Sequence, residues 1–263
     1  MYLSSLRIDL GVSGSAPTIG GRWLSNRYRV HQRLCMAFPS EQRLVTDPDF
    51  LAPFAPKDFP MVRAGSDRCR GVAGAEDLAQ VHAPRTVRDG FLFRIDPSRE
   101  GAQIIVQSAV VPNWSYAFAN FRGVLSTEPE VCEFAPAFAP GQQLQFRLEA
   151  NPTRKVDTKS ASEGVRRHGR RVPVPAAACI DWLRRFELAA GFNLDPQAVR
   201  LEYGVVRARK SSDTDDGVSY ASARFDGILA VTDPPVFSQR LFGGFGTAKA
   251  YGFGLMSVIP IVQ

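Results

Sequence analysis

Two side chains one helical turn apart could do acid–base chemistry in this chain. Tyr28 and His31 are three residues apart near the start of a predicted helix, so their side chains lie on one face. Histidine takes and gives protons near neutral pH, and tyrosine can donate a hydrogen bond or act as an acid. Arg27, Arg29 and Arg33 surround the pair and would attract a phosphate. Taken alone, such a pair is more often packing or surface than a site.

A glycine-rich run near the C-terminus is the second candidate. It holds Gly244, Gly246, Gly252 and Gly254 around Lys249. Glycine tolerates the positive φ that turns successive N–H groups toward one anion, and lysine adds a charge. The dinucleotide fingerprint fails because Lys249 stands where a third glycine is needed, and the mononucleotide loop fails because Ala250 replaces Ser/Thr. The run predicts contact with a nucleic-acid backbone phosphate, against the plainer alternative of an ordinary loop.

A basic loop over residues 151–171 is the third candidate. Its seven cations against two acids, Asp157 and Glu163, give a net charge of +5. The cations are Arg154, Lys155, Lys159, Arg166, Arg167, Arg170 and Arg171. The whole chain carries +6, with a pI of about 9.4. This balance favours a polyanionic partner, so we interpret the loop as tracking a nucleic-acid backbone rather than as a merely solvated segment.

Composition excludes several other classes of protein. The four cysteines are scattered and the three histidines lie far apart, so we expect no metal, no cofactor and no disulfide framework. No stretch approaches the roughly 18 uninterrupted apolar residues that cross a bilayer. The N-terminus lacks the hydrophobic block of a secretory signal, which predicts a cytoplasmic protein without a membrane partner.

The second half of the chain has a regular order of predicted elements. Leu144, Phe146 and Leu148 alternate with polar residues, as in a half-buried strand. The predicted elements are this strand, a helix at about 176–190, strands at about 201–208 and 219–232, a short helix after Asp233, and a closing strand at 252–262. This is βαββαβ, the ferredoxin-like plan.

The first half repeats the plan, with strands near Leu6 and at 91–95 and 104–106, a helix through Val30 and Leu34, and a second helix near 114–120. We therefore predict an α+β chain with two tandem ferredoxin-like (RRM-like) domains. The predicted boundaries are 1–132, with an irregular insertion at about 40–88, a linker at 133–141, and 142–263. No aromatic signature marks the strands, so an RNA duplex or hairpin suits the basic loops better than a single strand.

Several segments in the same order resemble a known family. They are Tyr28-Arg29-Val30-His31-Gln32-Arg33-Leu34, Phe146-Arg147-Leu148, Phe225-Asp226-Gly227-Ile228-Leu229 and the closing glycine run. Together they resemble the CRISPR-associated repeat endoribonucleases of the Cascade type, called CasE in type I-E systems. The resemblance runs from end to end.

The resemblance implies metal-independent cleavage of precursor CRISPR RNA at the base of the repeat hairpin. A ribose 2′-hydroxyl would attack the phosphate, leaving a 2′,3′-cyclic phosphate and a 5′-hydroxyl. It implies that His31 is catalytic and Tyr28 supports it, that Lys249 and the glycine run hold RNA, and that the loop around 166–171 meets the stem. It also implies retention of the guide RNA with other subunits of a surveillance complex. Two alternatives are a non-cleaving RNA-binding scaffold and a processing subunit of a related type IV system.

Overall fold

The computed structural model describes residues 1–11, 18–39, 90–98, 101–156, 170–208 and 217–261, together with Val45. The chain divides into two compact units. The first is Met1–Ala135 with Ala208–Val218, and the second is Pro136–Arg207 with Ser219–Gln263. Except for Val45, the insertion predicted at about 40–88 lies outside the described residues.

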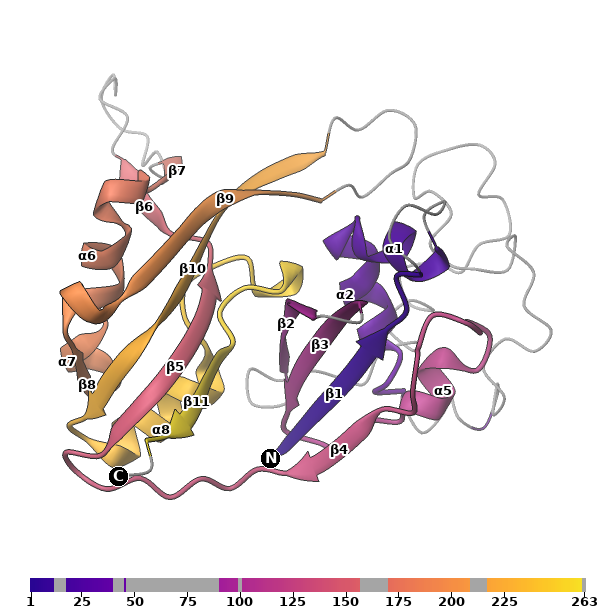
Figure 1. Cartoon of the computed structure of the whole chain (residues 1–263), viewed down its shortest axis with the longest axis horizontal. Helices are drawn as coiled ribbons and strands as arrows, with labels where there is room; N and C mark the ends of the chain where they lie inside the picture. The colour runs from indigo at the N-terminus through magenta and orange to yellow at the C-terminus, as the bar shows by residue number, and fades with distance from the viewer. Residues whose placement is uncertain are drawn as a thin grey trace, which may run out of the picture. The chain divides into compact units, whose positions relative to one another are not determined.

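The first unit is a four-stranded antiparallel sheet with helices on one face (Figure 1). Its elements are β1 (Tyr2–Ile8), α1 (Ile19–Leu24), α2 (Arg27–Cys35), β2 (Phe91–Ser98), β3 (Gly101–Ser108), α5 (Trp114–Phe118) and β4 (Glu130–Glu133). The strand order β2-β3-β1-β4 is that of a ferredoxin-like sheet.

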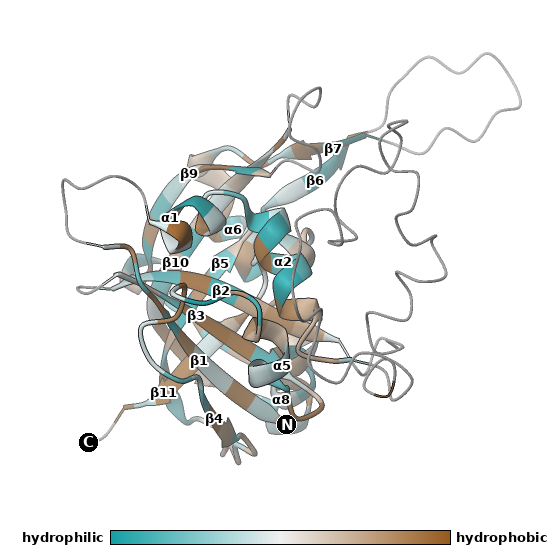
Figure 2. Ribbon diagram, turned by 90° about the vertical axis from the view of Figure 1, so that its right-hand side faces the viewer, coloured by the Kyte–Doolittle hydropathy of each residue, from teal (hydrophilic) through white to brown (hydrophobic). Residues whose placement is uncertain are grey.

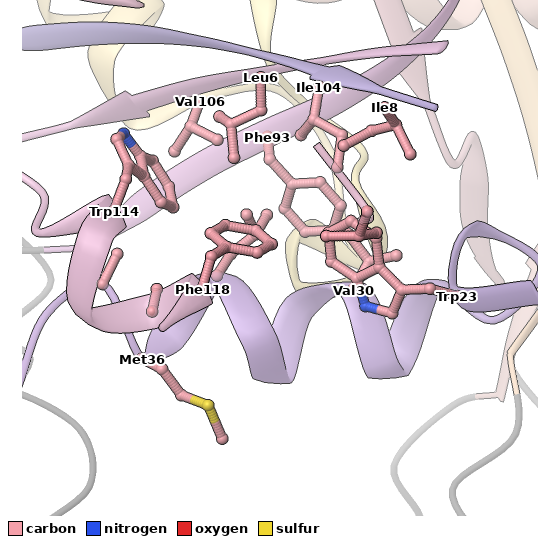
Figure 3. Close-up of a cluster of buried hydrophobic side chains, with 14 of the residues drawn as sticks. Leu6, Ile8, Trp23, Val30, Met36, Phe93, Ile104, Val106, Trp114 and Phe118 are labelled. Carbon is pink, nitrogen blue, oxygen red and sulfur yellow. The ribbon is translucent and has the colours of Figure 1, made fainter. Parts of the chain in front are cut away.

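Alternation along β1 decides which face of this sheet is covered. Ser4, Leu6 and Ile8 are buried, whereas Arg7 between them is exposed. Figure 3 shows Leu6 and Ile8 with Phe93 above the helices. The core beneath the sheet is completed by Trp23, Val30, Met36, Ile104, Val106, Trp114 and Phe118. This packing fixes α2 against the sheet and thereby fixes the helix that carries Tyr28 and His31.

Side-chain caps set where the helices of the first unit begin. The Asn26 carboxamide oxygen accepts from the Tyr28 N–H (3.1 Å), and the Asn113 oxygen accepts from the Tyr116 N–H (2.9 Å). Each cap satisfies an N–H group that the first helical turn leaves without a partner. Asn26 therefore sets the start of α2, and with it the direction of the Tyr28 and His31 side chains.

The second unit is a ferredoxin-like sheet with strand order β11-β5-β10-β8, in which β9 also pairs with β10. A separate two-stranded ribbon is formed by β6 and β7. The strands are β5 (Gln143–Ala150), β6 (Thr153–Val156), β7 (Arg170–Pro173), β8 (Phe192–Leu194), β9 (Arg200–Ala208), β10 (Val218–Val231) and β11 (Met256–Pro260). The helices are η3 (Ala176–Ala178), α6 (Cys179–Arg184), α7 (Glu187–Ala190), η4 (Pro196–Ala198), α8 (Pro234–Gly243) and η5 (Lys249–Tyr251).

The tandem ferredoxin-like prediction is confirmed, with local differences. The region predicted as a basic loop over residues 151–171 begins and ends in the strands β6 and β7. The helix predicted at 176–190 is divided into η3, α6 and α7, and it ends at Gly191 in the left-handed conformation (φ 66°). The closing strand is shorter than predicted because Gly252 (φ 80°) and Gly254 (φ 91°) hold a turn before Met256. Within the described ranges, no helix is long and apolar enough to span a membrane.

Candidate functional site

The imidazole of His31 lies on α2 against the aromatic side chains of β2. Its centroid is 5.4 Å from that of Phe91 and 6.3 Å from that of Phe93, with the latter ring nearly parallel. The Cys35 sulfur, one turn along the helix, lies 3.6 Å from His31 Nε2. His31 itself is half-buried, so its ring is oriented by packing on one side while solvent reaches the other.

Tyr28 lies one turn before His31 on the same helix and is also half-buried. Residues three apart on a helix are neighbours on its surface, so the hydroxyl and the imidazole can address one bound group. Figure 2 shows that much of α2 is hydrophilic, in keeping with its arginines and glutamine. The structure therefore places the predicted pair on one face of one capped helix.

The three arginines of α2 have different surroundings. Arg29 is exposed and Arg27 is half-buried, whereas the Arg33 side chain points into the unit. The Arg33 guanidinium donates to the Ala117 carbonyl and to Asn120 Oδ1, both at 2.9 Å, and lies over the Phe121 ring. Burial lowers the pKa of Arg33 to about 10. This position differs from the RNA contact predicted for Arg33, because its donors hold α5 and the segment after it.

The glycine run uses its backbone internally instead of forming the predicted anion cradle. Three N–H groups donate to the protein itself: Gly244 to Arg240, Gly252 to Lys249, and Gly254 to Glu149. A Cβ at Gly254 would lie 2.5 Å from the Phe245 carbonyl oxygen. A Cβ at Gly246 (φ 73°) would lie 3.1 Å from the Trp182 ring. The glycines thus allow positive φ and close packing.

Lys249 and Arg240 bring two cations together at the end of α8. Lys249 Nζ donates to the Gly243 carbonyl, and the Arg240 guanidinium lies over the rings of Phe186 (4.7 Å) and Phe245 (5.1 Å). Burial, and then the charge of Arg240, lower the pKa of Lys249. Sequence reasoning missed Arg240. A basic residue in the last turn of a predicted helix was the available signal, but it is a common feature of helix ends.

The described part of the basic loop is the ribbon of β6 and β7, whose predicted cations are exposed. Lys155 pairs with Arg171, and Arg170 pairs with Val156 on the other face. Arg154, opposite Val172, joins Arg170 there because alternate residues share a face. Each face therefore presents two cations. Arg166 and Arg167 lie outside the described residues.

No group of three or more His, Cys, Asp or Glu side chains that could hold a metal ion occurs in the portion of the chain that the structure describes. The imidazole of His31 and the phenol of Tyr28 on α2 are groups that can transfer protons. The cations of the second unit supply attraction for a polyanion.

The family model for "CRISPR associated protein" matches residues 76–260. The CRISPR-associated endoribonuclease Cse3 of Thermus thermophilus is 32% identical over 184 residues, which is 66% of this chain and 81% of that protein. The CRISPR system Cascade subunit CasE of Escherichia coli is 30% identical over 205 residues, which is 72% of this chain and 95% of that protein. A solved structure of Thermus thermophilus Cse3, bound to an RNA representing a pre-cleavage complex, has a TM-score of 0.64 at 25% identity and 98% coverage of both chains.

Two sheets with the ferredoxin-like strand order in one basic chain define a tandem ferredoxin-like protein. The matched residues include β2, β3, α5 and β4 of the first unit and nearly all of the second unit. The chain belongs to the CRISPR associated protein family that includes Cse3 and CasE.

Proposed function

We propose that this protein is an endoribonuclease that cleaves precursor CRISPR RNA within its repeats, with His31 and Tyr28 at the reacting bond. The half-buried imidazole on α2, oriented by Phe91 and followed by Cys35, is the observation that carries this assignment. Membership of the family that includes an endoribonuclease supports the reaction class. We expect the protein to act in the cytoplasm.

The reaction needs one proton removed and one supplied. When a ribose 2′-hydroxyl attacks the adjacent phosphate, its O–H bond breaks and a new O–P bond forms. The bond to the 5′-oxygen of the next nucleotide breaks, and that oxygen takes a proton. His31 can exchange a proton with either oxygen, and Tyr28 can donate a hydrogen bond to the phosphate or to the leaving oxygen. The products are a 2′,3′-cyclic phosphate and a 5′-hydroxyl.

Binding in this proposal uses the cations that reach solvent. Arg29 and Arg27 on α2 would hold the backbone near the reacting phosphate. The ribbon of β6 and β7, with Lys249 and Arg240, would hold a stem through its phosphates. The glycine run contributes by shaping the turn that carries Lys249, because three of its N–H groups already have partners.

The chain would stay bound to its cleaved product within a larger complex. The relative from Escherichia coli is named as a subunit of Cascade, and it is matched over 95% of its length. A protein that keeps the hairpin after one cut contributes both the guide RNA and a docking point for other subunits. Whether the system is of type I-E or type IV does not alter the proposed chemistry.

The decisive experiment mixes the protein with the repeat RNA of its own locus in excess chelator. We expect the parent to cut and His31→Ala to lose at least about 100-fold in rate while still binding the RNA. Tyr28→Phe should lose less. Leu188→Ala, at a 96% exposed residue of α7 in the second unit, serves as the control and should cut like the parent. Binding without cutting by the parent would favour the scaffold alternative, and equal cutting by His31→Ala would move the chemistry elsewhere.

A further inference from the structure

The first unit has a surface cavity that the proposed RNA chemistry does not use. It has a volume of about 890 Å³ and lies between the start of α5 and the segment that leads into β4. Figure 1 shows α5 and β4 as neighbouring rose-coloured elements. Its apolar lining includes Val111, Trp114, Phe118, Leu125 and Val131. Val111 is 61% exposed and Val131 is 42% exposed, so part of this apolar surface faces solvent.

The charge around the cavity is opposite to that of the chain. The segment 125–133 contains Glu128, Glu130 and Glu133 and no lysine or arginine, although the whole protein carries +6. All three glutamates are exposed. Glu130 pairs with Arg7, which leaves Glu128 at the cavity and Glu133 at the end of β4 as the acids of the rim. An acidic rim repels a nucleic-acid backbone and attracts lysine or arginine side chains.

The backbone of β4 offers hydrogen bonds along the same surface. β4 is an edge strand whose only neighbour among the described strands is β1. The Phe134 N–H donates to the Met1 carbonyl, and Leu3 pairs with Cys132. Because hydrogen-bonded residues alternate along an antiparallel pair, Val131 and Glu133 direct their N–H and C=O groups to the outer edge. A free edge of this kind accepts an added strand.

Two buried polar atoms beside the cavity have no hydrogen-bond partner among the described residues: Trp114 Nε1 and Ser4 Oγ. Trp114 is 5% exposed and lines the cavity, and Ser4 lies opposite Val131 in the strand register. Buried donors without partners are uncommon in folded proteins.

We propose that the cavity and the outer edge of β4 bind an extended segment of another protein subunit, with an apolar side chain in the cavity and a lysine or arginine beside Glu128 or Glu133. The added backbone pairs with Val131 and Glu133. This inference rests on the proposed function, because it assumes that the protein joins a complex of several subunits. It assigns that assembly to a surface of the first unit separate from the cations proposed to hold the RNA.

The test co-expresses the full chain with the other subunits of its own locus and measures the amount retained in the purified complex. Val131→Arg places a cation and a longer side chain on the docking edge, and we expect retention to fall at least tenfold. Val205→Arg is the matched control, a 66% exposed valine on β9, and should be retained like the parent. Glu128→Lys with Glu133→Lys reverses the rim charge without touching the core and should also reduce retention.

The same preparations distinguish this proposal from the proposed function. Each variant is scored for cleavage of repeat RNA by the isolated chain, which should equal that of the parent. Normal cleavage with undiminished retention in Val131→Arg and in the double variant would overturn the docking surface alone. A loss of RNA affinity in these variants would show that the surface binds RNA. If the parent forms a dimer and Val131→Arg is monomeric, the surface binds a second copy of this chain. Either result overturns the proposal. If Val131→Arg does not fold, retention of the Glu128→Lys and Glu133→Lys double variant tests the docking surface instead.

Discussion

Arg33 and Arg29 are four residues apart on α2, yet they have different roles. Arg33 is 7% exposed and makes two hydrogen bonds within the unit, whereas Arg29 is exposed. Truncation of Arg33 leaves the Ala117 carbonyl and the Asn120 side chain without their donor. Truncation of the exposed Arg29 side chain removes no hydrogen bond to a buried group among the described residues.

We expect Arg33→Ala to destabilise the protein by about 2–4 kcal/mol, because buried acceptors lose their donor and a packed side chain is removed. Arg29→Ala should stay within about 0.5 kcal/mol of the parent but bind repeat RNA more weakly. Urea denaturation and RNA titration of both variants measure the two effects. The opposite pattern, with stability lost at Arg29 and affinity lost at Arg33, would contradict this division.

Lys249 titrates under the influence of Arg240. Burial is the larger cause of its lowered pKa, and the charge of Arg240 is the smaller one. Since the folded pKa lies below the unfolded one, the unfolded chain binds the proton more tightly between the two values, and stability rises with pH across that window. Arg240→Gln should raise the Lys249 pKa toward, but not to, its ordinary value of 10.5. NMR titration of the lysine side chain measures this, and an unchanged pKa would mean that Arg240 exerts no influence.

At the scale of elements, the glycine run is a packed turn between α8 and β11. Gly254 combines a φ of 91° with a site where a Cβ would lie 2.5 Å from a carbonyl oxygen. Gly243 ends α8, and a Cβ there would meet nothing within 4 Å. The fold therefore requires glycine at position 254, whereas position 243 has room for a side chain.

Gly254→Ala should cost about 2–4 kcal/mol, from backbone strain and overpacking together. Gly243→Ala should change stability by less than about 1 kcal/mol, in the stabilising direction, since alanine favours the helix. Thermal or urea unfolding of the two single variants tests the contrast. Equal stability of both variants would show that the turn adapts to a side chain.

The ribbon of β6 and β7 carries its charge in cross-strand pairs. Lys155 and Arg171 lie opposite each other, so removing both clears one face while Arg154 and Arg170 remain on the other. If the ribbon follows RNA phosphates, Lys155→Ala with Arg171→Ala should lower the slope of log affinity against log salt by about one per lost contact. Binding measured at several salt concentrations provides the slope. A slope equal to that of the parent would remove the ribbon from the RNA interface.

In the whole molecule, the proposed function assigns the chemistry to the first unit and most of the stem-binding cations to the second. His31 and Tyr28 belong to the first unit, whereas the ribbon, Arg240 and Lys249 belong to the second. Each unit has its own sheet and its own buried core. The proposal therefore separates the residues that break a bond from many of those that hold the substrate.

We expect His31→Ala to abolish cleavage at saturating protein with little change in affinity. The Lys155→Ala and Arg171→Ala double variant should lose affinity but recover the parent rate at saturation. The triple variant should combine the lost cleavage of His31→Ala with the lowered affinity of the double variant. Single-turnover kinetics over a range of protein concentrations measures both quantities. A saturating rate that stays low in the double variant would mean that the ribbon also positions the reacting bond.

Features that depend on near neighbours along the chain can be predicted from its residues. Alternation in Leu144, Phe146 and Leu148 predicts β5, and the three-residue spacing of Tyr28 and His31 places both on one helix face wherever α2 lies. The βαββαβ order of both halves follows from such local periods. The short segments that resemble the family, which include Tyr28-Arg29-Val30-His31-Gln32-Arg33-Leu34, predict the activity.

Features that depend on partners distant in sequence can be seen only in the folded protein. Arg33 is internal because it meets Ala117, 84 residues away, and no local pattern distinguishes it from Arg29. The N–H of Gly254 is satisfied by the Glu149 carbonyl, and the Arg240 guanidinium lies over Phe186. These contacts arise when strands and helices far apart in the chain pack together, and packing is set by three-dimensional complementarity that residue spacing alone does not encode.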